Sequence, residues 1–182
     1  MARLLSIGEL IQCYRRNRGM TLAQLSELTG IHKGTISKIE NGDVKRPEYK
    51  TIRLLADTLQ IPLETLVELH IAVDNRSDTL LFVLQDVIQH SGTAELVTKV
   101  GRKLLESSSD DHALTELLYY FTSNVENKEI QLALYQLIVD YSRDHGLMPF
   151  LARGLLQVYL MTSPGSDRFT RAARISFSTP NF

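Results

Sequence analysis

Apolar residues recur three or four positions apart along most of the chain, which is the spacing of an amphipathic α-helix. Polar and glycine-containing stretches interrupt the pattern at short intervals and separate one predicted helix from the next. The pattern predicts an all-α fold with at least ten helices, over residues 6–19, 21–30, 33–41, 49–59, 63–70, 78–90, 93–107, 111–125, 127–145 and 147–162.

Capping residues mark the boundaries of the first helices. Ser6 and Glu9 have the spacing of a capping box, and Thr21 and Gln24 repeat that spacing before the second apolar stripe. Gly30 ends this short second helix, and a third helix begins near residue 33. Two short helices joined by a tight turn that contains glycine are typical of a helix-turn-helix motif.

The later apolar stripes predict helical hairpins, arranged like those of an α-solenoid. After residue 162 the stripe is lost, and residues rich in Ser, Thr, Arg and Pro predict a disordered or loosely packed, irregular tail. The predicted organisation is a helix-turn-helix domain at residues 1–70, a helical hairpin domain for regulation or dimerisation at 71–162, and the tail at 163–182.

Charge is distributed unevenly, although the whole chain carries a net charge of −1. Residues 3–53 hold ten Lys or Arg and five Asp or Glu side chains, whereas residues 71–182 hold ten basic and thirteen acidic ones. The helix-turn-helix domain at residues 1–70, called the head below, is therefore basic, and the rest of the chain is acidic. This distribution indicates that the head binds a polyanion such as DNA. Ordinary scatter of surface charge remains an alternative reading of the charges alone.

The segment TLAQLSELTGIHKGTISKIENG, residues 21–42, resembles the Xre/Cro/C1 family of helix-turn-helix transcriptional regulators. Lambdoid phage repressors and the biofilm regulator SinR are members of this family. The loop NGDVKRP that follows is similar to that of a lambdoid phage repressor, and the resemblance covers about residues 6–69. It implies a five-helix, lambda-repressor-like DNA-binding domain and double-stranded DNA as the partner.

The resemblance places the helix over residues 33–41 in the major groove, where an α-helix fits and its first residues reach base edges. Its outward positions are the candidate base contacts: Lys33, Gly34, Thr35, Ser37 and Lys38. The flanking positions are the candidate phosphate contacts: Arg16, Arg18, Thr21, Gln24, Asn41, Lys45 and Arg46.

Each of these assignments has an alternative. Thr35 and Ser37 can simply solvate the helix face, and Lys33 and Lys38 can bind phosphate, which positions the protein without reading sequence. We expect a base contact for Lys33 and leave Lys38 open. Arg16 and Arg18 can instead complement the dipole at the end of the first helix.

Three residues depart from the family pattern. Leu22 stands where many members carry Gln, His32 replaces the usual Ser or Thr cap, and Gly34 removes a side chain from the recognition helix. These departures keep a second hypothesis open, in which a degenerate head accompanies a protein-interaction module that captures a regulator or peptide.

The order of a helix-turn-helix head followed by helical hairpins is similar to that of bacterial peptide-pheromone receptor regulators, which are longer. This similarity implies that a peptide or protein ligand at the C-terminal helices tunes the head. Family members commonly bind DNA as dimers, so we expect a homodimer. The loss of helical pattern near residue 163 also suggests a shortened form of a longer regulator.

Residues typical of catalysis are scattered. The five histidines form no HExxH or Cys/His cluster, and neither nucleotide-binding glycine motifs nor a GxSxG motif occur. The sequence therefore predicts no enzyme, no metal site and no cofactor. The single cysteine excludes an internal disulfide, and no apolar run is long enough to span a membrane, which favours a cytoplasmic protein of a bacterium or phage.

Overall fold

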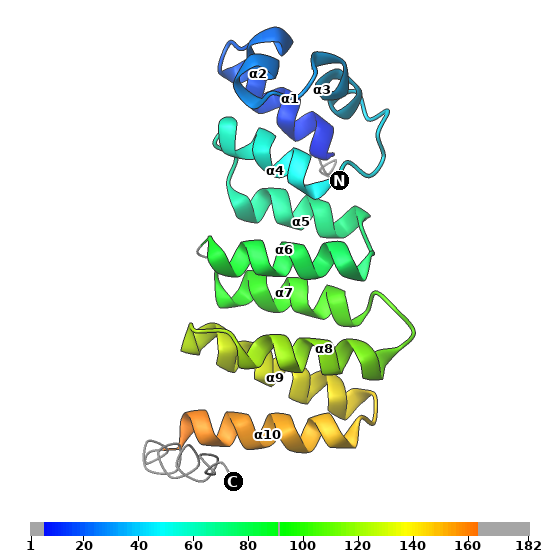
Figure 1. Ribbon diagram of the computed structural model, residues 1–182, viewed down its shortest axis with the longest axis vertical. Coiled ribbons are helices and arrows are strands. Elements are labelled where there is room, and N and C mark those ends of the chain that lie inside the picture. The colour runs from blue at the N-terminus through cyan, green and yellow to red at the C-terminus, as the bar shows by residue number, and fades with distance from the viewer. Residues whose placement is uncertain (1–5, 91, 164–182) are drawn as a thin grey trace, which may run out of the picture. The chain divides into compact units, whose positions relative to one another are not determined.

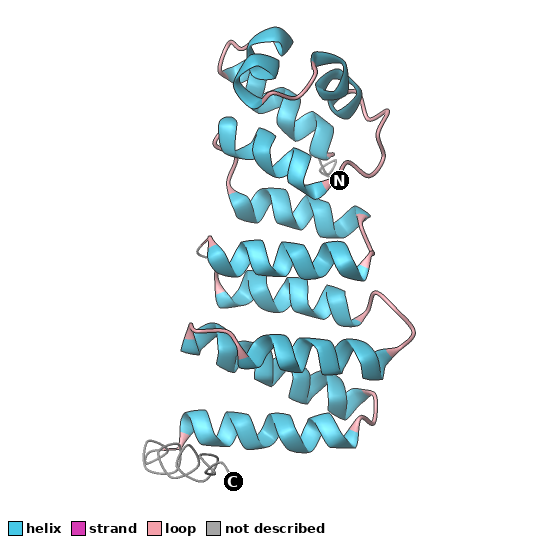
Figure 2. Cartoon of the chain, in the orientation of Figure 1, coloured by secondary structure: helices cyan, strands magenta, loops and turns pink. Residues whose placement is uncertain are grey.

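The computed structural model describes residues 6–90 and 92–163. All ten elements formed by these residues are α-helices, and no strand occurs among them (Figure 2). The predicted all-α fold class is therefore confirmed. The chain divides into two compact units, Met1–Ser107 and Ser108–Phe182, which are described separately below.

Seven helices belong to the first unit (Figure 1). Their bounds are α1 (Ile7–Asn17), α2 (Leu22–Thr29), α3 (Lys33–Glu40), α4 (Tyr49–Thr58), α5 (Leu63–Val73), α6 (Ser77–Gln89) and α7 (Ala94–Leu105).

Both predicted capping boxes form at the start of the chain. The Ser6 hydroxyl accepts a hydrogen bond from the Glu9 amide at 3.2 Å, and the Glu9 carboxylate accepts one from the Ser6 amide at 2.8 Å. Thr21 and Gln24 make the same two bonds at 3.2 and 2.8 Å. These bonds satisfy amide groups that have no partner within the helix, and so they fix where α1 and α2 begin.

The core of the first five helices includes apolar residues that helical spacing places on the inner faces. Ile11, Leu25, Ile36 and Leu55 are fully buried. Spacing predicts Leu22, Leu25 and Leu28 as the apolar face of α2, but Leu28 is 61% exposed, so its prediction as part of the buried face is wrong. Because α2 has only eight residues, its packed face is narrow, and Leu25 is its one buried residue.

The helices α6 and α7 run side by side and belong to the same compact unit as the head (Figure 1). The Asp86 carboxylate of α6 accepts hydrogen bonds from the Tyr49 hydroxyl and from Nε of Arg53, both at 2.8 Å, which ties α6 to α4. Burial and the bond to Asp86 raise the pKa of Tyr49. The compact unit thus extends to Ser107, whereas the functional domain limits expected at residues 70 and 162 stay predictions.

The second unit contains α8 (Asp111–Ser123), α9 (Lys128–Asp144) and α10 (Met148–Thr162). The Tyr141 hydroxyl donates to the Asp111 carboxylate at 2.9 Å, and the buried Gln131 amide donates to the Thr122 carbonyl at 3.1 Å, so α9 is held to α8 at two places.

Gly154 lets α10 lie close to α9, since a β-carbon at this position would be 2.8 Å from a methyl group of Val139. Phe150 and Gly154 therefore form the buried side of α10, and Leu155, which the stripe places inside, is 47% exposed. In α8, Leu117 is likewise 41% exposed, although it follows the buried Leu114 by three residues and helical spacing predicts it inside. The predicted tail lies outside the described residues, apart from Ser163. No described helix is long and apolar enough to cross a membrane.

Candidate nucleic-acid interface

A tight connection joins α2 to α3. Gly30 ends α2 with a φ of +70°, a conformation that glycine adopts without steric cost, and Ile31 and His32 complete the turn. The α3 helix then begins at Lys33, as the sequence predicts. The two short helices therefore have the connectivity of a helix-turn-helix motif.

The two sides of α3 differ in polarity. Ile36 and Ile39 are buried against the rest of the head. Lys33, Thr35 and Lys38 are exposed, and no hydrogen bond or ion pair within the described part of the chain engages their side chains. Gly34 and Ser37 lie half-buried on the flanks of this outer face.

Glu40, the one acidic residue of α3, is removed from the surface. Its carboxylate accepts two hydrogen bonds from Arg15 of α1, from Nε at 2.6 Å and from Nη2 at 2.7 Å. A third bond, from Nη1 of Arg15 to the Met20 carbonyl at 2.7 Å, fixes the guanidinium further. The bond to Glu40 raises the pKa of Arg15. The outer face of α3 is left with positive charge alone.

From the sequence, Arg15 belongs to the last turn of α1, where a cation complements the helix dipole, and its pairing with Glu40 is not apparent. Helical periodicity does indicate that Glu40 is buried, because it follows the core residue Ile39 and lies one helical turn after the core residue Ile36. The same periodicity places Arg15 four residues after the buried Ile11.

His32 caps α3, although histidine is an uncommon cap. Its Nδ1 accepts a hydrogen bond from the Gly34 amide at 3.1 Å. A β-carbon on Gly34 would lie 3.1 Å from the same nitrogen, so the absence of a side chain there leaves room for the imidazole. His32 and Gly34, two of the three departures from the family pattern, thus act together to start the helix.

The start of α2 leaves one side-chain donor group without a partner among the described residues. Because Gln24 Oε1 accepts from the Thr21 amide, the NH₂ group of the same carboxamide points away from that bond. Thr21 and Gln24 are both exposed. The Thr21 hydroxyl oxygen, in contrast, already accepts the cap bond from the Gln24 amide.

The basic candidates near the end of α1 differ in their surroundings. Arg16 is exposed, and its guanidinium has no hydrogen-bonding partner among the described residues. Arg18 donates from Nη2 to Gln60 Oε1 at 2.6 Å, across to the turn between α4 and α5. This bond gives Arg18 a structural role that sequence spacing did not reveal.

The chain leaves α3 through a basic loop. The side-chain Nδ2 of Asn41 donates to the Ser37 hydroxyl at 3.4 Å, and Gly42 has a φ of +75° that turns the chain. Lys45 and Arg46 are exposed, whereas Pro47 is buried and anchors the loop. The structure therefore brings candidate contacts from α2, α3 and this loop into one compact unit.

Comparison with known families agrees with this geometry. The family described as Helix-turn-helix matches residues 12–66, from within α1 to within α5. Residues 12–66 form a helix-turn-helix domain. It is of the Xre/Cro/C1 type, so the family resemblance noted in the sequence is confirmed.

Three regulators of Bacillus subtilis (strain 168) are similar to the helix-turn-helix domain. The uncharacterized HTH-type transcriptional regulator RghRB is 43% identical over 60 residues, and the HTH-type transcriptional repressor RghR is 40% identical over 62. The HTH-type transcriptional regulator SlrR is 32% identical over 62 residues.

The similarity to these relatives is confined to the head. The matched segments make up 33% of this chain for RghRB and 34% for each of RghR and SlrR. They cover 43% of RghRB, 46% of RghR and 41% of SlrR, so the chain spans less than half the length of each relative. No solved structure gives a significant match to the chain.

Proposed function

We propose that the chain is a sequence-specific DNA-binding transcriptional regulator that inserts α3 into the major groove. The observation that carries the proposal is the outer face of α3, where Lys33, Thr35 and Lys38 are exposed and unpaired among the described residues while Glu40 is buried against Arg15. A positively charged, exposed helix start suits a groove lined by phosphates and base edges.

Lys33, as the first residue of α3, is the base-reading side chain in this proposal. Residues at the start of a recognition helix reach deepest, and a lysine ammonium donates to guanine O6 and N7. Thr35 can donate or accept a hydrogen bond at a base edge or place its methyl group against thymine. Gly34 contributes close approach of the backbone, and Ser37 and Lys38 lie at the margin of the contact.

Phosphate contacts come from both sides of α3. The Gln24 carboxamide NH₂ and the exposed Arg16, Asn41, Lys45 and Arg46 side chains supply donors of the kind that bind phosphate oxygens. Arg18 and Thr21 are weaker candidates, because Nη2 of Arg18 is bound to Gln60 and the single hydroxyl hydrogen of Thr21 is donated to Gln24 Oε1, whereas Asn41 uses one of its two side-chain hydrogens for Ser37.

A homodimer on two half-sites is the expected binding form. One small head buries about 600–1,000 Å² on DNA, which gives limited specificity, and two heads double the number of base pairs read. The helices after the head supply the surface for dimerisation or tuning in this proposal.

Selection of bound sites from random DNA tests the proposal with the full chain. We expect an enriched motif, and we expect Lys33→Ala to lose discrimination at one base pair per half-site, at a cost of about 1–3 kcal/mol. Arg46→Ala is the matched control, because loss of a phosphate contact weakens all sequences alike. Equal losses for both variants on every sequence would contradict base reading by Lys33, and salt-sensitive binding without any motif would contradict sequence-specific regulation.

Binding of a peptide or protein by the second unit is a second candidate function. A cavity of about 780 Å³ lies among α8, α9 and α10, and its lining includes Tyr119, Tyr135 and Gln157. Burial raises the pKa of Tyr135 to about 12. Near this cavity, Tyr120 and Tyr159 are 56% and 65% exposed.

Peptides selected on a displayed library against the full chain would test this second function. We expect the selected peptides to lose affinity for Gln157→Ala, which alters the cavity wall. Gln136→Ala is the control, since Gln136 is exposed on α9 and donates to Asp140 away from the cavity lining. Equal binding by both variants would remove the cavity from consideration.

A further inference from the structure

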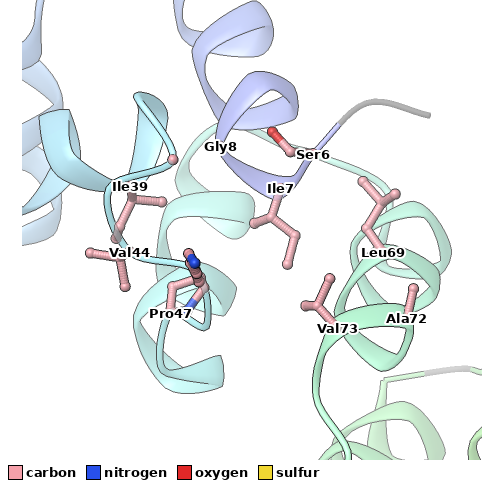
Figure 3. Close-up of a pocket in the computed structure, with 11 residues that line it drawn as sticks. Ser6, Ile7, Gly8, Ile39, Val44, Pro47, Leu69, Ala72 and Val73 are labelled. Atoms are coloured by element: carbon pink, nitrogen blue, oxygen red, sulfur yellow. The ribbon is translucent and has the colours of Figure 1, made fainter. Parts of the chain in front are cut away.

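A second cavity, of about 370 Å³, lies beneath the basic loop of the head. One wall comes from Ile39 at the end of α3 and from Val44 and Pro47 of the loop, and the facing wall comes from Leu69, Ala72 and Val73 of α5 (Figure 3). Ile7 projects between the two walls from the start of α1 (Figure 3). All of these residues belong to one compact unit.

The lining is apolar except at its edge. Among the lining residues, Lys45 is the one that carries a charge, and Ser6 is the one with a side-chain hydroxyl. The Ser6 oxygen is occupied by the cap bond from the Glu9 amide, whereas no described residue forms a hydrogen bond or ion pair with the Lys45 amino group. The cavity thus combines an apolar body with a single unpaired cation at its rim.

We propose that this cavity binds a small amphipathic anion, with an aliphatic chain between the two walls and a carboxylate at Lys45. The volume falls within the range of about 300–1,000 Å³ that is usual for sites of small molecules. Charge complementarity selects the class of ligand, because burial of the apolar chain supplies most of the affinity and Lys45 favours an anionic head over a neutral or cationic one.

Occupancy has a consequence for DNA that rests on the proposed function. Lys45 is a candidate phosphate contact, and Ile39 belongs to the last turn of the recognition helix. A carboxylate paired with Lys45 neutralises a charge that would otherwise meet the DNA backbone. We therefore expect the ligand and DNA to oppose each other's binding, by the same factor in both directions.

Calorimetric titration of the full chain with octanoate, in the absence of DNA, tests the site independently of the proposed function. We expect saturable binding of one octanoate per chain, about fivefold tighter than octanol and octylammonium, which share its chain length. Lys45→Gln changes an exposed side chain and leaves the core intact. This variant should bind octanoate only as tightly as it binds octanol.

Ala72→Phe fills the cavity from α5 and should abolish binding of all three probes. Ala152→Phe is the matched control, because Ala152 is also an exposed alanine within a helix but lies in the other unit. Circular dichroism and the molar mass of each variant accompany the titrations, so that a loss of fold is separated from a loss of binding.

Three results would overturn the site: no saturable octanoate binding, equal affinity for the three probes, or binding that survives in folded Ala72→Phe. A change in molar mass of Ala72→Phe without a change in octanoate affinity would assign the cavity to a second copy of the chain instead. Saturable octanoate binding in a chain that binds no DNA would leave the site standing and refute the proposed function alone.

Discussion

Gly8 of α1 lies directly against the backbone carbonyl oxygen of Ile39 in α3, and no side chain fits between them. A β-carbon on Gly8 would overlap this oxygen and would also lie 3.1 Å from the Glu40 carbonyl oxygen. Both neighbours are backbone atoms, which cannot rotate away as a side chain can. The close approach therefore sets the position of α3 relative to α1.

Gly8→Ala should destabilise the head, although replacing glycine by alanine within a helix usually stabilises it. We expect a loss of about 3 kcal/mol in the free energy of unfolding, at the upper end of the range for overpacking, measured by urea denaturation. Gly154→Ala is the control, because its β-carbon would meet a Val139 methyl group at 2.8 Å, and that side chain can adjust. Equal losses in the two variants would contradict this account of the α1–α3 contact.

The buried ion pair between Arg15 and Glu40 gives a second prediction. Glu40→Gln leaves the Arg15 guanidinium buried without its counterion, and breaking a buried pair in this way costs about 3–5 kcal/mol. The double variant Arg15→Met/Glu40→Leu removes both charges, so we expect it to recover most of that loss. Urea denaturation of the single and double variants measures the recovery. If the double variant is as unstable as Glu40→Gln, packing and not charge pairing holds the two helices together.

His70 makes the stability of the first unit depend on pH. Its ring is fully buried, 5.0 Å from the Tyr49 ring, and Nε2 is 3.7 Å from the Asp74 carboxylate, too far for a hydrogen bond. Burial lowers the pKa of His70 below its ordinary value of 6.5, because the attraction of Asp74 offsets the loss of hydration only in part and Arg76 opposes it.

Below pH 6.5 the unfolded chain binds a proton at His70 that the folded chain resists, so the free energy of unfolding should fall as the pH drops from 7.5 to 5.0. Asp74 does not contribute in this window, because its bonds to Arg76 lower its pKa below 3.8. Urea midpoints at the two pH values should differ less in His70→Leu than in the unsubstituted chain. His112→Gln is the control, at an exposed histidine of the second unit that forms no ion pair among the described residues, and a His70→Leu variant that keeps the full difference would refute the assignment.

Local chemistry explains why the helix boundaries were predictable. The capping boxes at Ser6 and Thr21 and the glycine that ends α2 act within a few residues, so their spacing in the sequence is enough to place them. The inward positions of α3 follow for the same reason, since Ile36 and Ile39 repeat at helical spacing.

Long-range packing explains what the sequence did not reveal. Arg15 and Glu40 are 25 positions apart, and nothing in either local pattern pairs them. The exposure of Leu28 and Leu155 depends on which neighbouring helix reaches them, because an apolar stripe is wider than the face that packs. The burial of His70 likewise follows from its packing against Tyr49 of α4, which histidine spacing does not encode.

The last prediction concerns the salt dependence of DNA binding and separates the basic residues that meet phosphate from those that hold the fold. Each neutralised phosphate adds about 0.9 to the slope of log K against log salt. Lys45→Gln and Arg46→Gln should therefore each lower the slope by about 1, measured by fluorescence anisotropy on one selected site between 50 and 200 mM salt, a range of about fourfold. Arg18→Gln should leave the slope unchanged, because Arg18 is bound to Gln60. A lower slope for Arg18→Gln would assign Arg18 to the DNA interface and place the turn after α4 beside the phosphates. An unchanged slope for Lys45→Gln and Arg46→Gln would show that the basic loop is not part of the DNA interface.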